Sequence, residues 1–249
     1  MKGNTYFRSL IIPAAALILA ACATRPSLLE QLEQLPVKHL SFYNFDPSTP
    51  IKDRITDVPA ELLGLYSDSD DTELRSYKLT ADEKKQIEDT FSRLPDRHRE
   101  VLEKRLIGVY CVENFIGTGM ADYVLGPDNE VYAQLVLHPR VFEMNASQIL
   151  SLRANTAFRS DDEEMELVID LSNEVSGLDY IVLHESTHIV DYVERHTPYV
   201  EPGMYELFGR SGRNTSFTDE VWSDYRTLNP TVEFEFQEDL RYYGLGGDP

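Results

Sequence analysis

The apolar positions between Thr80 and Pro95 recur with the period of an α-helix. Thr80 and Glu83 are three residues apart, which is the spacing of a capping box at a helix N-terminus. Because proline blocks the continuation of a helix, the pattern predicts a helix that ends before Pro95. A second helix is expected over residues 97–105.

A β-like pattern follows, because three short runs rich in β-branched and aromatic residues are separated by turn residues. They predict strands at residues 106–112, 121–125 and 131–137, with a turn at 126–129 between the last two. Beyond them, an apolar stretch at 178–193 has the composition of a buried helix. The sequence therefore predicts an α+β fold in which a small mixed or antiparallel sheet packs on this helix.

The N-terminus has the features of a secretory signal. Lys2 and Arg8 accompany an apolar run that is too short to span a bilayer comfortably. The residues that end at Cys22 resemble the lipobox of bacterial lipoproteins, in which the cysteine is lipidated and becomes the first residue after cleavage. The resemblance implies a signal peptide at residues 1–21 and a lipid anchor on Cys22. Ala23 is not the aspartate that retains many such lipoproteins at an inner membrane, which favours the outer membrane.

Composition limits the partners and the number of domains. Residues 22–75 are expected to hold the lipidated cysteine, a tether and an irregular N-terminal extension, and residues 76–249 the main domain. With Cys22 lipidated, Cys111 has no partner for an intramolecular disulfide. The chain has 43 acidic and 23 basic residues, and its net charge of −20 argues against a nucleic acid partner.

His184, Glu185 and His188 form the His-Glu-x-x-His pattern of zinc hydrolases. On a helix, residues four apart lie on one face, so both imidazoles can reach one metal ion while Glu185 projects beside them. We therefore predict that His184 and His188 ligate Zn²⁺. Glu185 is expected to be the catalytic base that takes a proton from the attacking water.

A catalytic zinc site needs three protein ligands and an open position, so a third ligand is expected downstream. Glu220 and Asp224 are one helical turn apart, and they resemble the glutamate helix of gluzincins such as the thermolysin-like peptidases. The resemblance implies that Glu220 ligates zinc and that Asp224 orients His184 by accepting its second N–H. Three further carboxylates remain open as the third ligand, namely Glu206, Glu235 and Glu238.

The two motifs together imply a zincin-like catalytic domain over residues 76–249, with further helices after the active-site helix. Zincins bind a peptide as an extra strand along a sheet edge beside that helix, where main-chain hydrogen bonds hold the peptide. Residues 131–137 are the expected edge strand, and residues 165–171 are the alternative.

We therefore expect a zinc metallopeptidase that acts on peptides or proteins of the bacterial cell envelope, where its lipid anchor holds it at a membrane. A non-catalytic envelope lipoprotein, with a degenerate or truncated zincin fold used for binding, is the alternative from another functional class. A third alternative keeps the metal but hydrolyses an amide that is not a peptide bond. Zinc content and chelator-sensitive cleavage distinguish the first two.

Overall fold

The computed structural model describes residues 34–70, 73–115, 117–127, 130–157, 167–171, 175–196, 220–221 and 229–231. The predictions for Cys22, for Asp224 and for the alternative ligands Glu206, Glu235 and Glu238 lie outside these residues and stay predictions. Within the described part, no helix is both long and apolar enough to cross a bilayer.

The strands of the described residues form one mixed sheet with the order β1-β2-β4-β3. They are β1 (Arg75–Ser76), β2 (Leu106–Glu113), β3 (Gly119–Leu125) and β4 (Val131–Leu137). β2 is parallel to β4, whereas β1 pairs antiparallel with β2 and β3 pairs antiparallel with β4. The α+β class and the small mixed sheet predicted from the sequence are confirmed.

The edge strand differs from the prediction. Val131–Leu137 was expected at the sheet edge, but as β4 it lies between β2 and β3, so this prediction is wrong. The edge strands are β1 and β3, and β3 is the edge strand beside α6. The physical reason is that every residue of β4 except Tyr132 is buried, as in a strand covered on both faces. The alternative edge at 165–171 forms no strand in its described part, residues 167–171.

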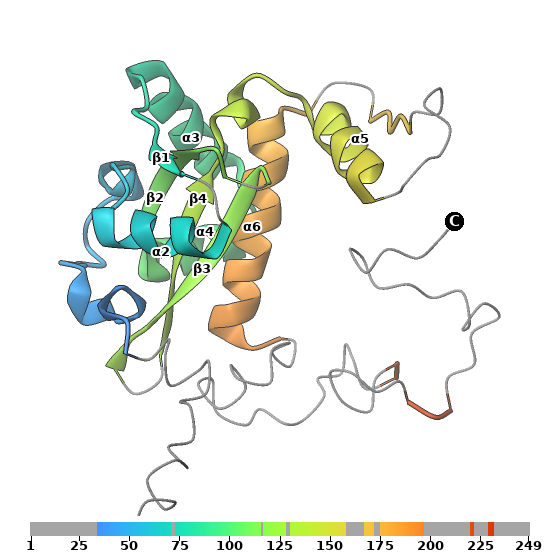
Figure 1. Cartoon of the computed structure of the whole chain (residues 1–249). Helices are drawn as coiled ribbons and strands as arrows, with labels where there is room; N and C mark the ends of the chain where they lie inside the picture. The colour runs from blue at the N-terminus through green and yellow to red at the C-terminus, as the bar shows by residue number, and fades with distance from the viewer. Residues whose placement is uncertain are drawn as a thin grey trace, which may run out of the picture.

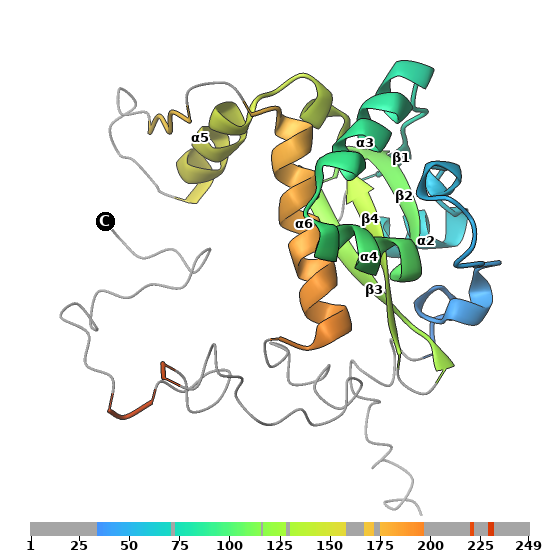
Figure 2. The ribbon, with the colours of Figure 1, turned by 180° about the vertical axis from the view of Figure 1, so that it is seen from behind.

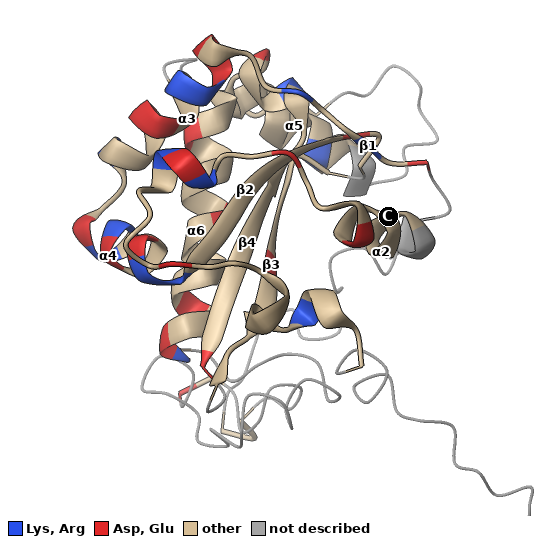
Figure 3. Ribbon diagram, turned by 90° about the vertical axis from the view of Figure 1, so that its left-hand side faces the viewer, with Lys and Arg blue, Asp and Glu red and all other residues tan. Residues whose placement is uncertain are grey.

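Helices cover both faces of this sheet. The described α-helices are α2 (Ala60–Asp70), α3 (Ala81–Arg93), α4 (Asp96–Arg105), α5 (Ala146–Ala157) and α6 (Gly177–Glu194). Figure 3 shows α3, α4 and α6 on one side of the sheet and α2 on the other. Figures 1 and 2 show that α6 runs alongside β3, the edge strand. The predicted helices at 80–94, 97–105 and 178–193 correspond to α3, α4 and α6, and the capping box of Thr80 and Glu83 is confirmed.

Alternate residues of the central strand serve two hydrophobic cores, as the two-residue period of a strand requires. Leu135 and Leu137 belong to the core that includes Val182 and Ile189 of α6. Val136 points to the opposite core, which includes Leu62 of α2. The first of these cores holds α6 against one face of the sheet. The polar side of α6 therefore faces away from the sheet.

The segment before β1 was expected to be irregular, but it contains α2 and three short 3₁₀ helices, which are η2 (Pro36–Lys38), η3 (Leu40–Phe42) and η4 (Ile51–Arg54). It packs on the sheet through Val37, Val58 and Leu62, all of which are buried. The described part of this segment is therefore integral to the core, whereas the division of the whole chain into domains stays a prediction.

Two buried charges attach this segment to the rest of the fold. The guanidinium of Arg54 donates to the carbonyl oxygens of Leu106 at 2.6 Å and of Glu103 at 2.9 Å, which stand at the end of α4 where helical carbonyls lack partners. The ammonium of Lys38 pairs with the carboxylate of Asp122 on β3, and both side chains are buried. Tyr66 also donates to this carboxylate, at 2.9 Å.

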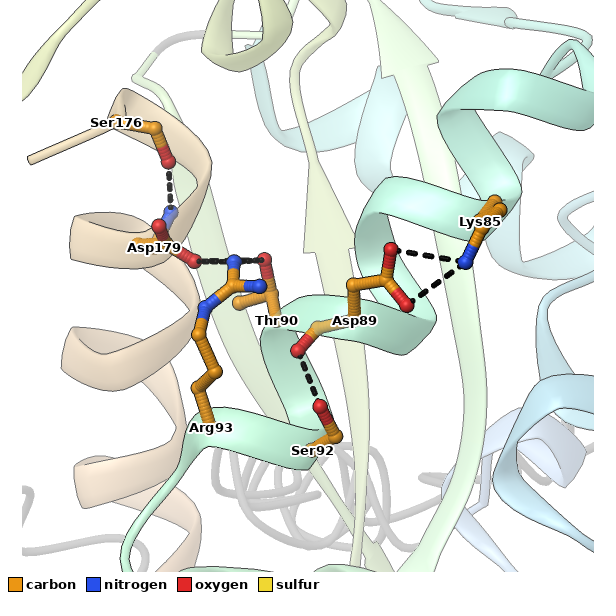
Figure 4. A network of polar contacts seen from close by, with 7 residues as sticks. All are labelled: Lys85, Asp89, Thr90, Ser92, Arg93, Ser176 and Asp179. Carbon is orange, nitrogen blue, oxygen red and sulfur yellow. Dashed lines mark hydrogen bonds and ion pairs between the residues drawn. The ribbon is translucent and has the colours of Figure 1, made fainter.

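The start of α6 is fixed by its own cap and by α3, as Figure 4 shows. The Ser176 hydroxyl accepts a hydrogen bond from the N–H of Asp179 at 3.0 Å, and so caps the first turn. The Asp179 carboxylate accepts hydrogen bonds from Thr90, at 2.7 Å, and from the guanidinium of Arg93. Burial raises the pKa of Asp179, but these bonds outweigh it and hold the pKa below its usual range.

Replacing Asp179 by asparagine should lower the free energy of unfolding by about 1–2 kcal/mol, because a partly exposed charge-assisted contact and a favourable charge at a helix N-terminus are lost. Since the pKa of Asp179 is lower in the folded state, this stability is present above about pH 4 and is lost as the pH falls through the folded value. Urea denaturation at pH 7 and pH 3 measures both effects.

Asp89→Asn is the matched control, because the Asp89 carboxylate pairs with Lys85 on the exposed surface of α3 (Figure 4). It should cost no more than about 0.5 kcal/mol. Equal losses in the two variants would mean that the contact between α3 and α6 does not fix the start of α6.

Candidate metal centre and pocket

Helix α6 carries the three residues of the His-Glu-x-x-His motif in one continuous helical segment. It begins after Ser176 and ends at Arg195, whose left-handed conformation, with φ of 58°, stops the helix. Ile181, Val182, Ile189 and Val190 bury the sheet-facing side. The helical spacing assumed from the sequence therefore holds at the motif itself.

The two histidines lie next to each other, as a shared metal requires. The centroids of the His184 and His188 rings are 4.9 Å apart and the ring planes are at 85°. Two imidazoles this close together on one helix face could both ligate one Zn²⁺ ion.

The environment of His184 favours the neutral imidazole that binds metal. His184 is half-buried, and burial, with the nearby charges of His188 and Arg153, lowers the pKa of His184. His188 is exposed, and its ring stacks on Tyr192 with the centroids 6.1 Å apart. Tyr180 lies beside His184 at 6.0 Å between ring centroids, so four aromatic rings follow one another along this face of α6.

Glu185 is buried between α6 and the edge strand, with 7% of its surface exposed. A hydrogen bond from the backbone N–H of Ala121 on β3 reaches its carboxylate. Burial raises the pKa of Glu185 to about 7, against the opposing effects of this bond and of the Arg153 charge. A carboxyl group with such a pKa can both accept and return a proton near neutral pH.

Glycine at position 119 makes this close approach possible. A Cβ atom at Gly119 would lie 2.4 Å from Cγ2 of Ile181 and 3.0 Å from Cγ of Glu185, which is closer than packed carbon atoms allow. Any larger residue would push β3 away from α6. The absence of a side chain at Gly119 therefore brings the edge strand within hydrogen-bonding distance of Glu185.

A pocket of about 460 Å³ opens beside the motif. His184 and Glu185 line it from α6, together with Tyr180, while Gly119 lines it from the edge strand. Its volume lies in the range of small-molecule and peptide side-chain sites. The pocket thus places open space next to one predicted metal ligand and next to the predicted base.

Ser186, which lies between the two histidines, has a structural role. The Ser186 side chain is fully buried, and its hydroxyl donates to the carbonyl of Leu183 at 3.0 Å. The same hydroxyl lies 2.9 Å from Nδ1 of His98 on α4. Burial lowers the pKa of His98. Ser186 therefore attaches the back of the motif to α4, while both predicted ligands remain on the other side.

The third ligand is not brought together with the histidines in the described part of the chain. Glu220 lies in a turn and its side chain is exposed. Among the described residues, no group of three histidine, cysteine, aspartate or glutamate side chains is placed to share a metal ion. The assignments of Glu220 and Asp224 stay predictions.

Several residues at this site carry no motif in the sequence. Arg140, Arg153, Tyr180 and Gly119 all line the pocket, although sequence reasoning assigned them no function. The sequence does contain a sign of α5, the helix that carries Arg153, because Asn145 and Gln148 have the spacing of a helix cap. In the structure, the side chain of each accepts a hydrogen bond from the backbone N–H of the other at 2.9 Å.

Comparison with known proteins gives no family for this chain. No protein-family model matches it, and neither the curated proteins nor the solved structures give a match. The argument for function therefore depends on the residues and geometry described above.

Proposed function

We propose that this protein is a zinc-dependent metallopeptidase with a zincin-like catalytic domain, anchored by lipid on Cys22 at the bacterial cell envelope, with the outer membrane favoured. The observation that carries the proposal is the geometry of α6. It presents two adjacent imidazoles and, between them in sequence, a buried carboxyl with a pKa of about 7, beside an open pocket and a sheet edge.

The donors on α6 suit zinc, because neutral imidazoles are among its preferred ligands and a nearby carboxylate can act as a base. His184 and His188 would hold the ion, with Glu220 as the proposed third ligand and Asp224 as the proposed partner of His184. When bound, zinc would polarise a carbonyl group and lower the pKa of a coordinated water.

Glu185 is the proposed proton carrier. Its raised pKa leaves the carboxyl able to accept a proton from the attacking water and to pass it to the leaving amine. The N–H of Ala121 points at this carboxylate and so orients it. Because β3 is an edge strand beside α6, a peptide could pair with its backbone and lie across the pocket.

The zinc content of the purified protein tests the proposal, measured by elemental mass spectrometry beside a Glu220→Ala variant. We expect about one zinc per chain in the wild-type protein and at least tenfold weaker retention in the variant, because a ligand is lost. Asp170→Ala, which changes another carboxylate, serves as the matched control and should keep its zinc. Full retention in Glu220→Ala would move the third ligand to another residue, and absence of zinc from every sample after reconstitution would favour the non-catalytic lipoprotein.

A further inference from the structure

The pocket beside the motif is lined by positive charge in a strongly acidic protein. The chain carries a net charge of −20, yet two of the residues that line this pocket are arginines, Arg140 and Arg153. Glu185 is the single carboxylate that lines it within the described part of the chain. The local charge is therefore opposite in sign to that of the molecule as a whole.

The side chain of Arg140 is held in place by His138, just ahead of α5 in the chain. It belongs to the 3₁₀ helix η6 (Pro139–Phe142), which follows β4. His138 caps this helix: its Nδ1 accepts a hydrogen bond from the Arg140 backbone N–H at 3.1 Å and another from Nε of Arg140 at 3.3 Å. None of the ion pairs between described residues involves Arg140. His138 therefore orients the guanidinium of Arg140, which lines the pocket.

Arg153 reaches the same pocket from α5. It lies one turn after Ile149 and next to Leu152, both of which also line the pocket. The charge of Arg153 acts on His184 and on Glu185, so it stands within electrostatic reach of the predicted ligand and base. Leu152 and Tyr180 add apolar and aromatic surface to the same pocket.

We propose that Arg140 and Arg153 together bind a carboxylate of the substrate, so that the pocket selects peptides with an acidic side chain or a free C-terminus next to the scissile bond. This inference rests on the proposed function, since it takes the substrate to be a peptide. A guanidinium binds a carboxylate through two parallel N–H···O bonds, which gives both affinity and orientation. The apolar wall of the pocket accommodates the aliphatic part of the residue that carries the carboxylate.

The test uses binding and not turnover, so that it does not depend on catalysis. The Glu185→Gln protein is titrated with fluorophore-labelled alanine pentapeptides, and fluorescence anisotropy gives the dissociation constants. The peptides have a central glutamate or a central glutamine, each with a free or an amidated C-terminus. The uncharged peptide, with glutamine and an amide, should bind about 10- to 100-fold more weakly than the best carboxylate peptide. Whether the side chain or the terminus supplies the preference identifies the source of the carboxylate.

Variants of the arginines assign the effect to the pocket. Arg140→Gln and Arg153→Gln should each remove most of the preference for a carboxylate, while Arg140→Lys should keep part of it because the charge remains without the fork geometry. Arg75→Gln is the matched control, since Arg75 is exposed on β1 and pairs with Glu73. Circular dichroism confirms that each variant is folded.

Three results would overturn the inference. These are equal binding of charged and uncharged peptides, no measurable binding of any peptide, and an equal loss of preference in Arg75→Gln. Failure of the proposed function has a different signature, because a protein without zinc and without peptidase activity can still prefer carboxylate peptides through these arginines.

Discussion

Replacing Glu185 by glutamine should reduce peptide hydrolysis by at least about 10³-fold while zinc remains bound, because the amide cannot accept the proton of the attacking water. Glutamine has nearly the same shape, so both imidazoles should keep their positions. Burial penalises the charged form of Glu185, so the neutral replacement should be at least as stable as the wild-type protein. Hydrolysis of a mixed peptide library, zinc content and thermal unfolding measure the three parts of this prediction.

Glu88→Gln is the control for this experiment, since Glu88 is exposed on α3, far from the motif in sequence. It should retain full activity. A Glu185→Gln protein that still cleaves peptides at the wild-type rate would exclude Glu185 as the proton carrier, whatever the metal content.

His188→Ala should lose the metal itself. A site that is left with one imidazole of the predicted pair has too few ligands to hold zinc against dilution, so we expect less than about 0.1 zinc per chain after dialysis. Activity should fall with the metal. Because His188 is exposed and its ring packs beside His184 and Tyr192 of the same helix, the fold should be preserved.

His196→Ala provides the comparison, because His196 is an exposed histidine just beyond α6 that contacts Glu194. It should bind zinc as the wild-type protein does. Equal zinc content in the two histidine variants would mean that His188 is not a ligand, and the proposed centre would have to be abandoned.

The local structure around the motif was predictable because it depends on short-range spacing. The capping residues Thr80 and Glu83 are neighbours in sequence, and the apolar side of α6 is fixed by its helical period. Placing His184 and His188 on one face requires no knowledge of the rest of the chain.

The order of the strands was not predictable in the same way. Strand pairing joins residues far apart in sequence, such as Tyr110 and Val136 in the parallel pair of β2 and β4, and no local period encodes the choice of partner. The almost unbroken apolar run of β4 was nevertheless a sign of a strand buried on both faces.

The pocket arginines could not be found from spacing at all. Arg140 follows the sheet, Arg153 lies within α5, and both meet the motif only through the packing of α5 and η6 on α6. Their identity as charged residues suggests an ordinary exposed surface. Only the fold shows that they share a pocket with His184.

The ion pair between Lys38 and Asp122 couples the N-terminal segment to strand β3. Asp122 is adjacent to Ala121, whose N–H contacts Glu185, so a pull on the chain ahead of Pro36 would reach the strand beside the motif through Lys38. Shortening the chain past Lys38 would also leave a buried carboxylate without its cation, at a cost of about 3–5 kcal/mol. A lipid anchor on Cys22, as proposed above, would therefore be coupled through this ion pair to the strand that contacts Glu185.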